Sequence, residues 1–410
     1  MATTTITFFS VDNGDMTLVK LGDKAATTLM IDCNIREAAD DEEDDTRDVA
    51  ADLRNRLKRD SKGRPYVDAF LLSHPDADHC RGLKRHFYLG PLKNYPDDNK
   101  PDSEKRIVIR EMWSSPIVFR RASKDHVLSE DAVAFNSEAK RRVQANRDKN
   151  FSVPDGDRIL ILGEDEDGKT DDLDPILVKV DETITRLNGV QMPCLAAHLL
   201  APLPGCEDDL EEELTKNHSS VIINLDLTAD ESSSEIRNFL TGGDAEVSIW
   251  ELLWEKHQDD PAPLVYDLMQ TPHHCSWHSL SHDSWSELHE DAEVSSDAHA
   301  ALSQIRDNGV IVASSCPIED DDNDPPCYGA KIEYESIVDE VDGKFYVTGE
   351  YPKRSAVEPL EFLVTDRGIQ LKPLAKATSV NSLLRKTSSS SAGLAFPNKP
   401  VIPNKPAGFA

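Results

Sequence analysis

The feature that most constrains this chain is a short apolar run followed, without a spacer, by a loop dense in histidine and aspartate. Val67–Leu72 has the composition of a buried strand, and the loop Ser73–His79 reads S-H-P-D-A-D-H. Imidazole nitrogens and carboxylate oxygens both bind divalent ions such as zinc. Because so many polar groups would stay unsatisfied in a core, the pattern predicts a metal-binding loop rather than a solvated turn. Its candidate ligands are His74, Asp76, Asp78 and His79.

The same loop resembles the H-x-H-x-D-H metal loop of the metallo-β-lactamase fold. It is most similar to the soluble hydrolase domain of competence-type (ComEC-like) DNA-uptake proteins, in which S-H-P-D-A-D-H is a usual form. Asp76 stands where a second histidine is common in the wider superfamily. The extra oxygen ligand leaves manganese and magnesium open beside zinc.

Two segments near the N-terminus resemble further motifs of that family. Val11–Asp15 is similar to the V-G-Q-G-D turn that opens it, with Asp-Asn in place of Gly-Gln. Ile31–Asn34 is similar to I-D-x-G. The resemblance implies that Asp32 supports the metal loop without binding an ion.

Two later segments resemble the next motifs in the same order. Asn217–Leu225 is similar to N-N-x-S-L-V-L, and His218 stands near a metal-binding histidine of another branch. His218 is therefore either a ligand or a structural histidine. Leu240–Asp244 is similar to L-T-G-D, whose aspartate bridges two ions, although one additional glycine precedes Asp244 here.

The last motif is Thr271–Ser276, which is similar to P-H-H-G-S with Cys275 in place of glycine. The resemblance implies that His273 is a ligand and that His274 supports the site or faces the substrate. Cys33, Cys80 and Cys275 each adjoin a motif. They are either small buried packing residues or, alternatively, thiolate ligands or redox-sensitive groups.

Together these motifs imply a centre for two divalent ions, Zn or Mn, with Mg as a further option. The ions would bridge a water, lower its pKa and present hydroxide to phosphorus or to a carbonyl carbon. Asp78 is the candidate for orienting the nucleophile and moving its proton, and His274 is the second candidate catalytic residue. The candidate ligands are His74, Asp76, Asp78, His79, His218, Asp244 and His273.

The charge balance restricts the substrate. With 76 acidic and 45 basic residues, the net charge of -31 argues against a broad surface for duplex nucleic acid. We therefore expect a small or single-stranded phosphodiester held by local groups. Candidate cations lie in the segments Arg110–Arg121 and Glu138–Arg147, although a merely solvated basic helix is the alternative.

Three functions remain open on this basis. The resemblance favours a phosphodiesterase or nuclease acting on single-stranded or small nucleic acid. The same ions would also serve a lactonase or another ester or amide hydrolase. The third function is a metal-bound regulatory or interaction module.

The cysteine content and the hydropathy indicate the cellular compartment in which the protein is expected. Seven cysteines without a C-x-x-C pair do not resemble a disulfide framework, so a reducing cytoplasm is expected. The N-terminus lacks a basic region followed by an apolar core, and no stretch reaches the roughly 20 apolar residues of a membrane span. We therefore expect no association with a membrane.

The predicted fold is an α/β, four-layer αββα sandwich with the ions at one edge. We expect this hydrolase domain to span residues 1–378, with insertions near 91–150 and 164–216. Residues 379–410 are serine-rich and repeat Pro-Asn-Lys-Pro. Such a composition predicts a disordered tail that can dock a protein partner, and the oligomeric state is left open.

Overall fold

Two mixed β-sheets form the centre of this computed structural model, which describes residues 3–40, 44, 46–125, 127–203, 214 and 216–374. Both sheets belong to the compact unit Met1–Lys372. The predicted tail, residues 379–410, lies outside the described residues. Within the described residues, no helix combines the length and apolar composition needed to cross a bilayer.

Sheet A contains eleven strands in the order β20-β19-β1-β2-β3-β5-β7-β8-β9, with β4 paired to β5 and β6 to β7. It is antiparallel from β20 to β3 and parallel from β3 to β9. Its strands are β1 (Thr5–Phe8), β2 (Thr17–Lys20), β3 (Thr28–Ile31), β4 (Lys58–Arg59), β5 (Pro65–Leu71), β6 (Phe87–Tyr88), β7 (Ile107–Ser114), β8 (Arg158–Leu162), β9 (Leu177–Val178), β19 (Leu360–Thr365) and β20 (Gly368–Leu371).

Sheet B contains seven strands in the order β10-β13-β14-β15-β16-β17-β18. It is antiparallel from β10 to β15 and parallel from β15 to β18. Its strands are β10 (Thr183–Ile184), β13 (Leu195–Ala201), β14 (Ile222–Leu227), β15 (Arg237–Thr241), β16 (Tyr266–Gln270), β17 (Ile305–Ala313) and β18 (Lys344–Val347), and a separate hairpin joins β11 (Arg186–Leu187) to β12 (Val190–Gln191).

The alternation of side chains along the strands creates one core between the sheets and one on each outer face. In β14, Ile223 and Leu225 belong to the cluster shared by the two sheets, whereas Ile222 belongs to the cluster beneath the helices of sheet B. The rings of Phe8 in β1 and Phe239 in β15 meet edge to face, with centroids 5.7 Å apart. The sheets therefore pack face to face.

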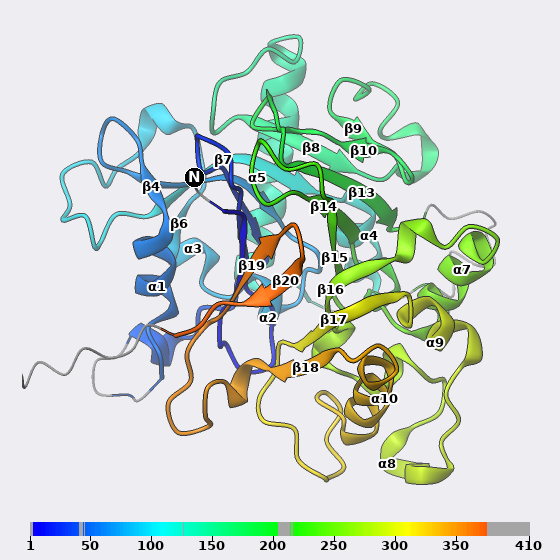
Figure 1. The fold of residues 1–410 in the computed structure, drawn as a ribbon. Coiled ribbons are helices and arrows are strands. Elements are labelled where there is room, and N and C mark those ends of the chain that lie inside the picture. The colour runs from blue at the N-terminus through cyan, green and yellow to red at the C-terminus, as the bar shows by residue number, and fades with distance from the viewer. Residues whose placement is uncertain are drawn as a thin grey trace, which may run out of the picture. The chain divides into compact units, whose positions relative to one another are not determined.

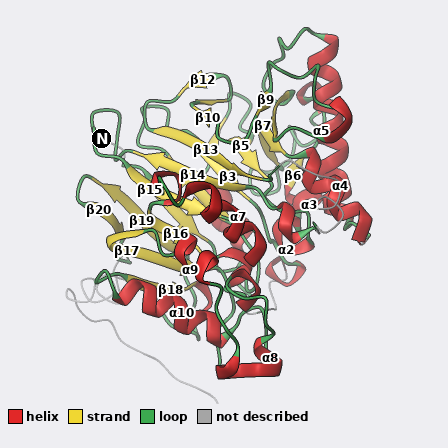
Figure 2. Ribbon diagram, turned by 90° about the vertical axis from the view of Figure 1, so that its right-hand side faces the viewer, coloured by secondary structure: helices red, strands yellow, loops and turns green. Residues whose placement is uncertain are grey.

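Helices cover the outer face of each sheet (Figures 1 and 2). α1 and α5 pack on sheet A, and α7, α9 and α10 pack on sheet B. The helices are α1 (Val49–Arg56), α2 (Ala77–Cys80), α3 (Leu83–His86), α4 (Pro116–Asp125), α5 (Glu130–Asp148), α7 (Val247–His257), α8 (Trp285–Leu288), α9 (Ser296–Leu302) and α10 (Tyr328–Asp339).

This order of layers confirms the predicted α/β sandwich, and it is consistent with a metallo-β-lactamase-like fold. The segment 91–150, expected as an insertion, contributes β7 to sheet A between β5 and β8, followed by α4 and α5. Most of the acidic stretch 207–216 lies outside the described residues.

Candidate metal centre

The predicted motifs meet at one edge of the sandwich because each follows the end of a strand. β3 leads into Asp32, β5 into the loop Ser73–His79, β15 into Asp244 and β16 into His273 and His274. The first two strands are parallel neighbours in sheet A, and the other two are parallel neighbours in sheet B. The site is therefore assembled from loops of both sheets.

The metal loop turns its second histidine inward through the short helix α2, for which Asp76 is the N-cap residue. His79 is fully buried; its Nδ1 lies 2.9 Å from an oxygen of Asp32, and its Nε2 lies 2.8 Å from Oδ1 of Asp244. The backbone N–H of Ser73 donates to Asp32 over 2.7 Å, and the Ser73 hydroxyl also bonds to that carboxylate. Asp32 thus fixes both the loop and the orientation of the His79 ring.

Burial and charge act in opposite directions on this pair. Burial raises the pKa of Asp32, and the neighbouring His79 offsets part of that shift. Burial works against a charged His79, but the carboxylates of Asp244 and Asp32 outweigh it and hold the pKa of that ring well above its usual value. The pair is a strong electrostatic contact inside the protein.

Three consecutive residues in the loop after β16 adopt left-handed backbone conformations, with φ values of 48° at His273, 53° at His274 and 72° at Cys275. Non-glycine residues rarely do so, and such strain is typical of functional sites. The turn is held by a hydrogen bond of 2.8 Å from the His273 N–H to the Gly243 carbonyl. Cys275 thus takes the conformation expected of glycine at its position, and the turn brings both histidines to Asp244.

His274 is fully buried and lies between three carboxylates. Its Nδ1 is 3.2 Å from Oδ1 of Asp15, and its Nε2 is 3.3 Å from Asp78 and 3.5 Å from Oδ1 of Asp244. Burial lowers the pKa of His274, but Asp244 and Asp15 reverse that effect and raise it to about 10. His274, assigned on the sequence to a supporting or substrate-facing role, thus points its Nε2 at two candidate ligands.

Asp15 is a member of the site that the sequence interpretation did not select. It is 2% exposed, and its carboxylate lies near both His79 and His274. The available signal was its position as the last residue of the Val11–Asp15 turn. Gly14 makes that turn possible, because a Cβ there would come within 2.0 Å of the Asn34 amide nitrogen.

Asp244 lies at the centre of the cluster, and its two oxygens face different histidines. Oδ1 is close to His79 and His274, whereas Oδ2 lies 3.8 Å from Nε2 of His74 and 3.8 Å from Nε2 of His273. Burial opposes ionisation, but the four histidines together hold the pKa of Asp244 well below its usual value. An ionised carboxylate with one oxygen towards each of two ligand sets is suited to bridging two ions.

The residue before Asp244 shows how the additional glycine is accommodated. Gly243 has a φ of 51°, and a Cβ there would lie 2.9 Å from the Ser73 hydroxyl. The Asp244 N–H donates to the Ser220 hydroxyl over 2.9 Å, and that hydroxyl lies 3.2 Å from Nδ1 of His74. The glycine thus permits the close approach of three loops, and Ser220 connects Asp244 to His74.

Two groups of side chains have the ligand spacing of an ion site on either side of Asp244. We call Asp78, His79 and His274, with Oδ1 of Asp244, the first half-site. We call His74 and Asp76, with Oδ2 of Asp244, the second half-site. A third group consists of Asp15, Asp32 and His79.

The residues of both half-sites fit divalent ions. Within the described part of the chain, Nε2 of His74 and Nε2 of His274 are buried but have no hydrogen-bond partner. Buried polar atoms normally have a hydrogen-bond partner. Imidazole nitrogens that lack one and face carboxylates are therefore arranged as they would be around a metal ion. Mixed nitrogen and oxygen donors of this kind can bind several divalent ions.

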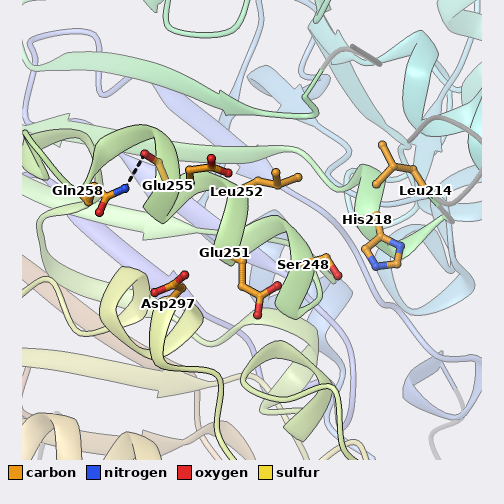
Figure 3. Close-up of a pocket in the computed structure, with 8 residues that line it drawn as sticks. All are labelled: Leu214, His218, Ser248, Glu251, Leu252, Glu255, Gln258 and Asp297. Carbon is orange, nitrogen blue, oxygen red and sulfur yellow. Dashed lines mark hydrogen bonds between the residues drawn. The ribbon is translucent and has the colours of Figure 1, made fainter. Parts of the chain in front are cut away.

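His218 and His273 lie at the margin of this cluster. His273 is 17% exposed and lies outside the three groups found in the described residues, although its Nε2 faces Asp244. His218 also lies outside those groups, and its Nε2 is 3.6 Å from a Glu246 oxygen. His218 lines a cavity of about 770 Å³, together with Leu214, Ser248, Glu251, Leu252, Glu255, Gln258 and Asp297 (Figure 3).

The cysteines beside the motifs are buried thiols. Cys33 donates to the Arg81 carbonyl over 3.3 Å, and Cys80 donates to the Asp76 carbonyl over 3.2 Å. Burial raises the pKa of Cys80 to about 12 and holds the pKa values of Cys33 and Cys275 well above the usual range. Protonated, buried thiols of this kind are expected of packing residues rather than of thiolate ligands or redox-sensitive groups.

The candidate cations of α5 make internal ion pairs. Arg142 is almost fully buried and contacts Glu138 over 2.8 Å, and Arg141 contacts both Glu138 and Asp157. Arg147 pairs with Asp172 over 2.6 Å. Arg141, Arg142 and Arg147 are therefore paired within the helix or with neighbouring segments.

No protein-family model matches the chain, and no curated protein shows significant similarity to it. The two mixed sheets and the buried histidine and aspartate cluster are consistent with a metallo-β-lactamase-like fold.

Proposed function

We propose that this protein is a metal-dependent phosphodiesterase or nuclease that acts on single-stranded or small nucleic acid, as its resemblance to the competence-type hydrolase domain implies. The observation that carries the proposal is the position of the Asp244 carboxylate. Its Oδ1 lies 2.8 Å from Nε2 of His79, and its Oδ2 lies 3.8 Å from Nε2 of His74. A carboxylate in this position would hold two ions side by side.

The two half-sites supply the ligands. Asp78, His79 and His274 would hold one ion, and His74 and Asp76 the other, with His273 beside the second. Divalent ions bound there would lower the pKa of a coordinated water and take up negative charge on the departing oxygen.

Asp78 is the residue that would move the proton. Its side chain is 31% exposed, whereas His79 and His274 are fully buried, so it faces solvent. Burial disfavours its charged form, but His274 and His79 outweigh this and lower its pKa. An ionised Asp78 can therefore accept a proton from the attacking water at its carboxylate oxygen and pass it to solvent.

Two carboxylates orient the buried rings. Asp32 forms a hydrogen bond with Nδ1 of His79, and the Asp15 carboxylate lies 3.2 Å from Nδ1 of His274, so that each Nε2 points into the site. Such pairing fixes the tautomer of a ligand histidine and increases its basicity. His273, partly exposed beside Asp244, would be a further ligand at the second half-site, as the resemblance implies.

The test is a metal-supplemented assay of single-stranded DNA, RNA, bis-p-nitrophenyl phosphate and lactones. We expect phosphodiester hydrolysis with manganese or zinc and close to two ions per chain by elemental analysis. Asp244→Asn should keep its fold, lose an ion and lose several orders of magnitude of activity, because it lacks the bridging charge. The matched control is Asp267→Asn, because Asp267 is also a buried aspartate but lies near the start of β16, at the end opposite to His273 and His274. A parent enzyme that hydrolyses only lactones, or an Asp244→Asn variant of near-parent activity, would contradict the proposal.

A further inference from the structure

An anionic substrate meets an unfavourable charge at this centre unless a cation lies beside it. The cluster contains five carboxylates: Asp15, Asp32, Asp76, Asp78 and Asp244. Two divalent ions would bring four positive charges, which leaves one negative charge in excess, and the whole protein carries -31. A further positive group beside the ions would therefore favour the binding of a phosphodiester.

Lys216 is placed at the second half-site. Its ammonium forms a close ion pair with Oδ2 of Asp76, and the same oxygen lies 3.4 Å from Nε2 of His74. The Lys216 side chain is 31% exposed and Asp76 is 20% exposed, whereas His74 is fully buried. The ammonium thus approaches the half-site from its solvent side.

We propose that Lys216 binds the anionic oxygen of the substrate beside the second half-site and thereby selects phosphodiesters over neutral esters. This inference rests on the proposed hydrolase function and deepens it. An ion held by His74 and Asp76 would compete with the ammonium for the same carboxylate oxygen, because two cations on one oxygen repel each other.

The chain near Lys216 keeps the ammonium close after such a displacement. The Val221 N–H donates to the Ser73 carbonyl over 2.9 Å, and the Ser220 hydroxyl contacts His74 over 3.2 Å. These bonds tie the segment after Lys216 to the metal loop. A lysine released from Asp76 would therefore stay at the mouth of the half-site, where it can donate to a non-bridging phosphoryl oxygen. A lactone carries no such charge.

A purely structural ion pair is the competing explanation, and binding measurements separate the two. We would load the parent, Lys216→Gln, Lys216→Met and Lys216→Arg with manganese and measure the Kd of inorganic phosphate by calorimetry. The affinity of the second manganese ion would be measured by titration. Lys179→Gln is the matched control, since Lys179 pairs with Glu164 over 2.6 Å and that pair is exposed.

We expect the two neutral variants to bind phosphate about ten- to a hundred-fold more weakly than the parent, as loss of a charge-assisted hydrogen bond implies. They should bind the second ion more tightly and show a higher KM for bis-p-nitrophenyl phosphate. Any lactone activity of the parent should be affected less than its phosphodiester activity, because a lactone offers no anionic oxygen to Lys216. Lys216→Arg should retain most of the phosphate affinity, because a guanidinium also binds phosphate. Lys179→Gln should match the parent.

Phosphate affinity in both neutral variants within roughly two-fold of the parent would overturn the assignment, since that difference is far below one charge-assisted bond. The assignment would also be overturned if the two neutral variants lost phosphodiester activity and lactone activity to the same extent. A parent that hydrolyses no phosphodiester but binds phosphate through Lys216 would refute the proposed function alone. A parent that hydrolyses phosphodiesters, with Lys216→Gln indistinguishable from it, would refute the role of Lys216 alone.

Discussion

Oδ1 of Asp15 lies 3.2 Å from Nδ1 of His274, so a turn near the start of the chain orients a histidine that follows a strand of the other sheet. Both side chains are buried. Because the Asp15 carboxylate faces Nδ1, the ring presents Nε2 to Asp78 and Asp244. A residue outside the half-sites therefore determines how one of them is formed.

We expect Asp15→Asn to weaken metal binding by about ten- to a hundred-fold without unfolding the protein, as is typical for a carboxylate behind a ligand histidine. The measurement is metal retention during dialysis against graded chelator concentrations. Asp12→Asn, in the same turn but half exposed and paired with Arg36, is the matched control. Equal retention by Asp15→Asn and the parent would contradict this role.

The histidines at positions 218 and 274 should differ in their effect on metal content. His274 belongs to the first half-site, whereas His218 lies 3.6 Å from a Glu246 oxygen and lines the cavity in Figure 3. We expect His274→Ala to retain fewer ions than the parent and His218→Ala to retain the full number, by elemental analysis after gel filtration. Loss of an ion from His218→Ala would instead make that residue a ligand.

A pH-dependent contribution to stability is expected from His198 on β13. Its Nε2 lies 3.0 Å from Asp226 on β14, and that hydrogen bond raises the pKa of His198. A raised pKa in the folded state means that the contribution is fully present below the unfolded value of about 6.5 and is lost as pH rises through the folded value. His198→Gln should therefore lower the free energy of unfolding more at about pH 5.5 than at about pH 8.5.

Urea unfolding at both pH values measures this difference. Asp226→Asn removes the partner of the histidine and should produce the same pH dependence of the loss. The double variant should lose no more pH-dependent stability than either single variant, because both remove one interaction. A loss that is equal at the two pH values would show that the charge on His198 adds nothing to the stability of this contact.

The left-handed turn can be tested at Cys275. Cys275→Gly and Cys275→Ala both remove the buried sulfur, but only alanine keeps a Cβ at a φ of 72°. We expect the glycine variant to be more stable than the alanine variant by about 1 kcal/mol, measured by urea unfolding. At Ala298 in α9, the same comparison should reverse, since glycine destabilises a helix by about 1 kcal/mol. Equal stability of the two Cys275 variants would contradict a left-handed backbone conformation at this position.

The sequence predicted those parts of the site that are contiguous in the chain. His74 to His79 lie on one loop after one strand, so their proximity follows from local order, and Asp244 was found because a short motif ends with it. The layers of the fold followed from the same strands. Each of these predictions depends on residues that are neighbours in the sequence.

The remaining features depend on contacts between distant segments. Asp15 lies beside His274 because the two sheets pack together, and no local sequence pattern predicts that packing. The orientation of His273 and His274 depends on a left-handed turn that a cysteine adopts in place of glycine. The basic residues Arg141 and Arg142 looked available because their buried partner Glu138 is recognisable only once the helix is packed.

Because each half-site takes its candidate ligands from loops of both sheets, neither sheet contains all the residues of a half-site. His74 to His79 follow a strand of sheet A, while Asp244 and His274 follow strands of sheet B. A nascent or proteolysed chain with only one sheet formed would thus be unable to capture ions, and the order of events in maturation would be docking first and metallation second. Once bound, an ion would act as a non-covalent cross-link between the sheets, so removal of metal should accelerate their separation.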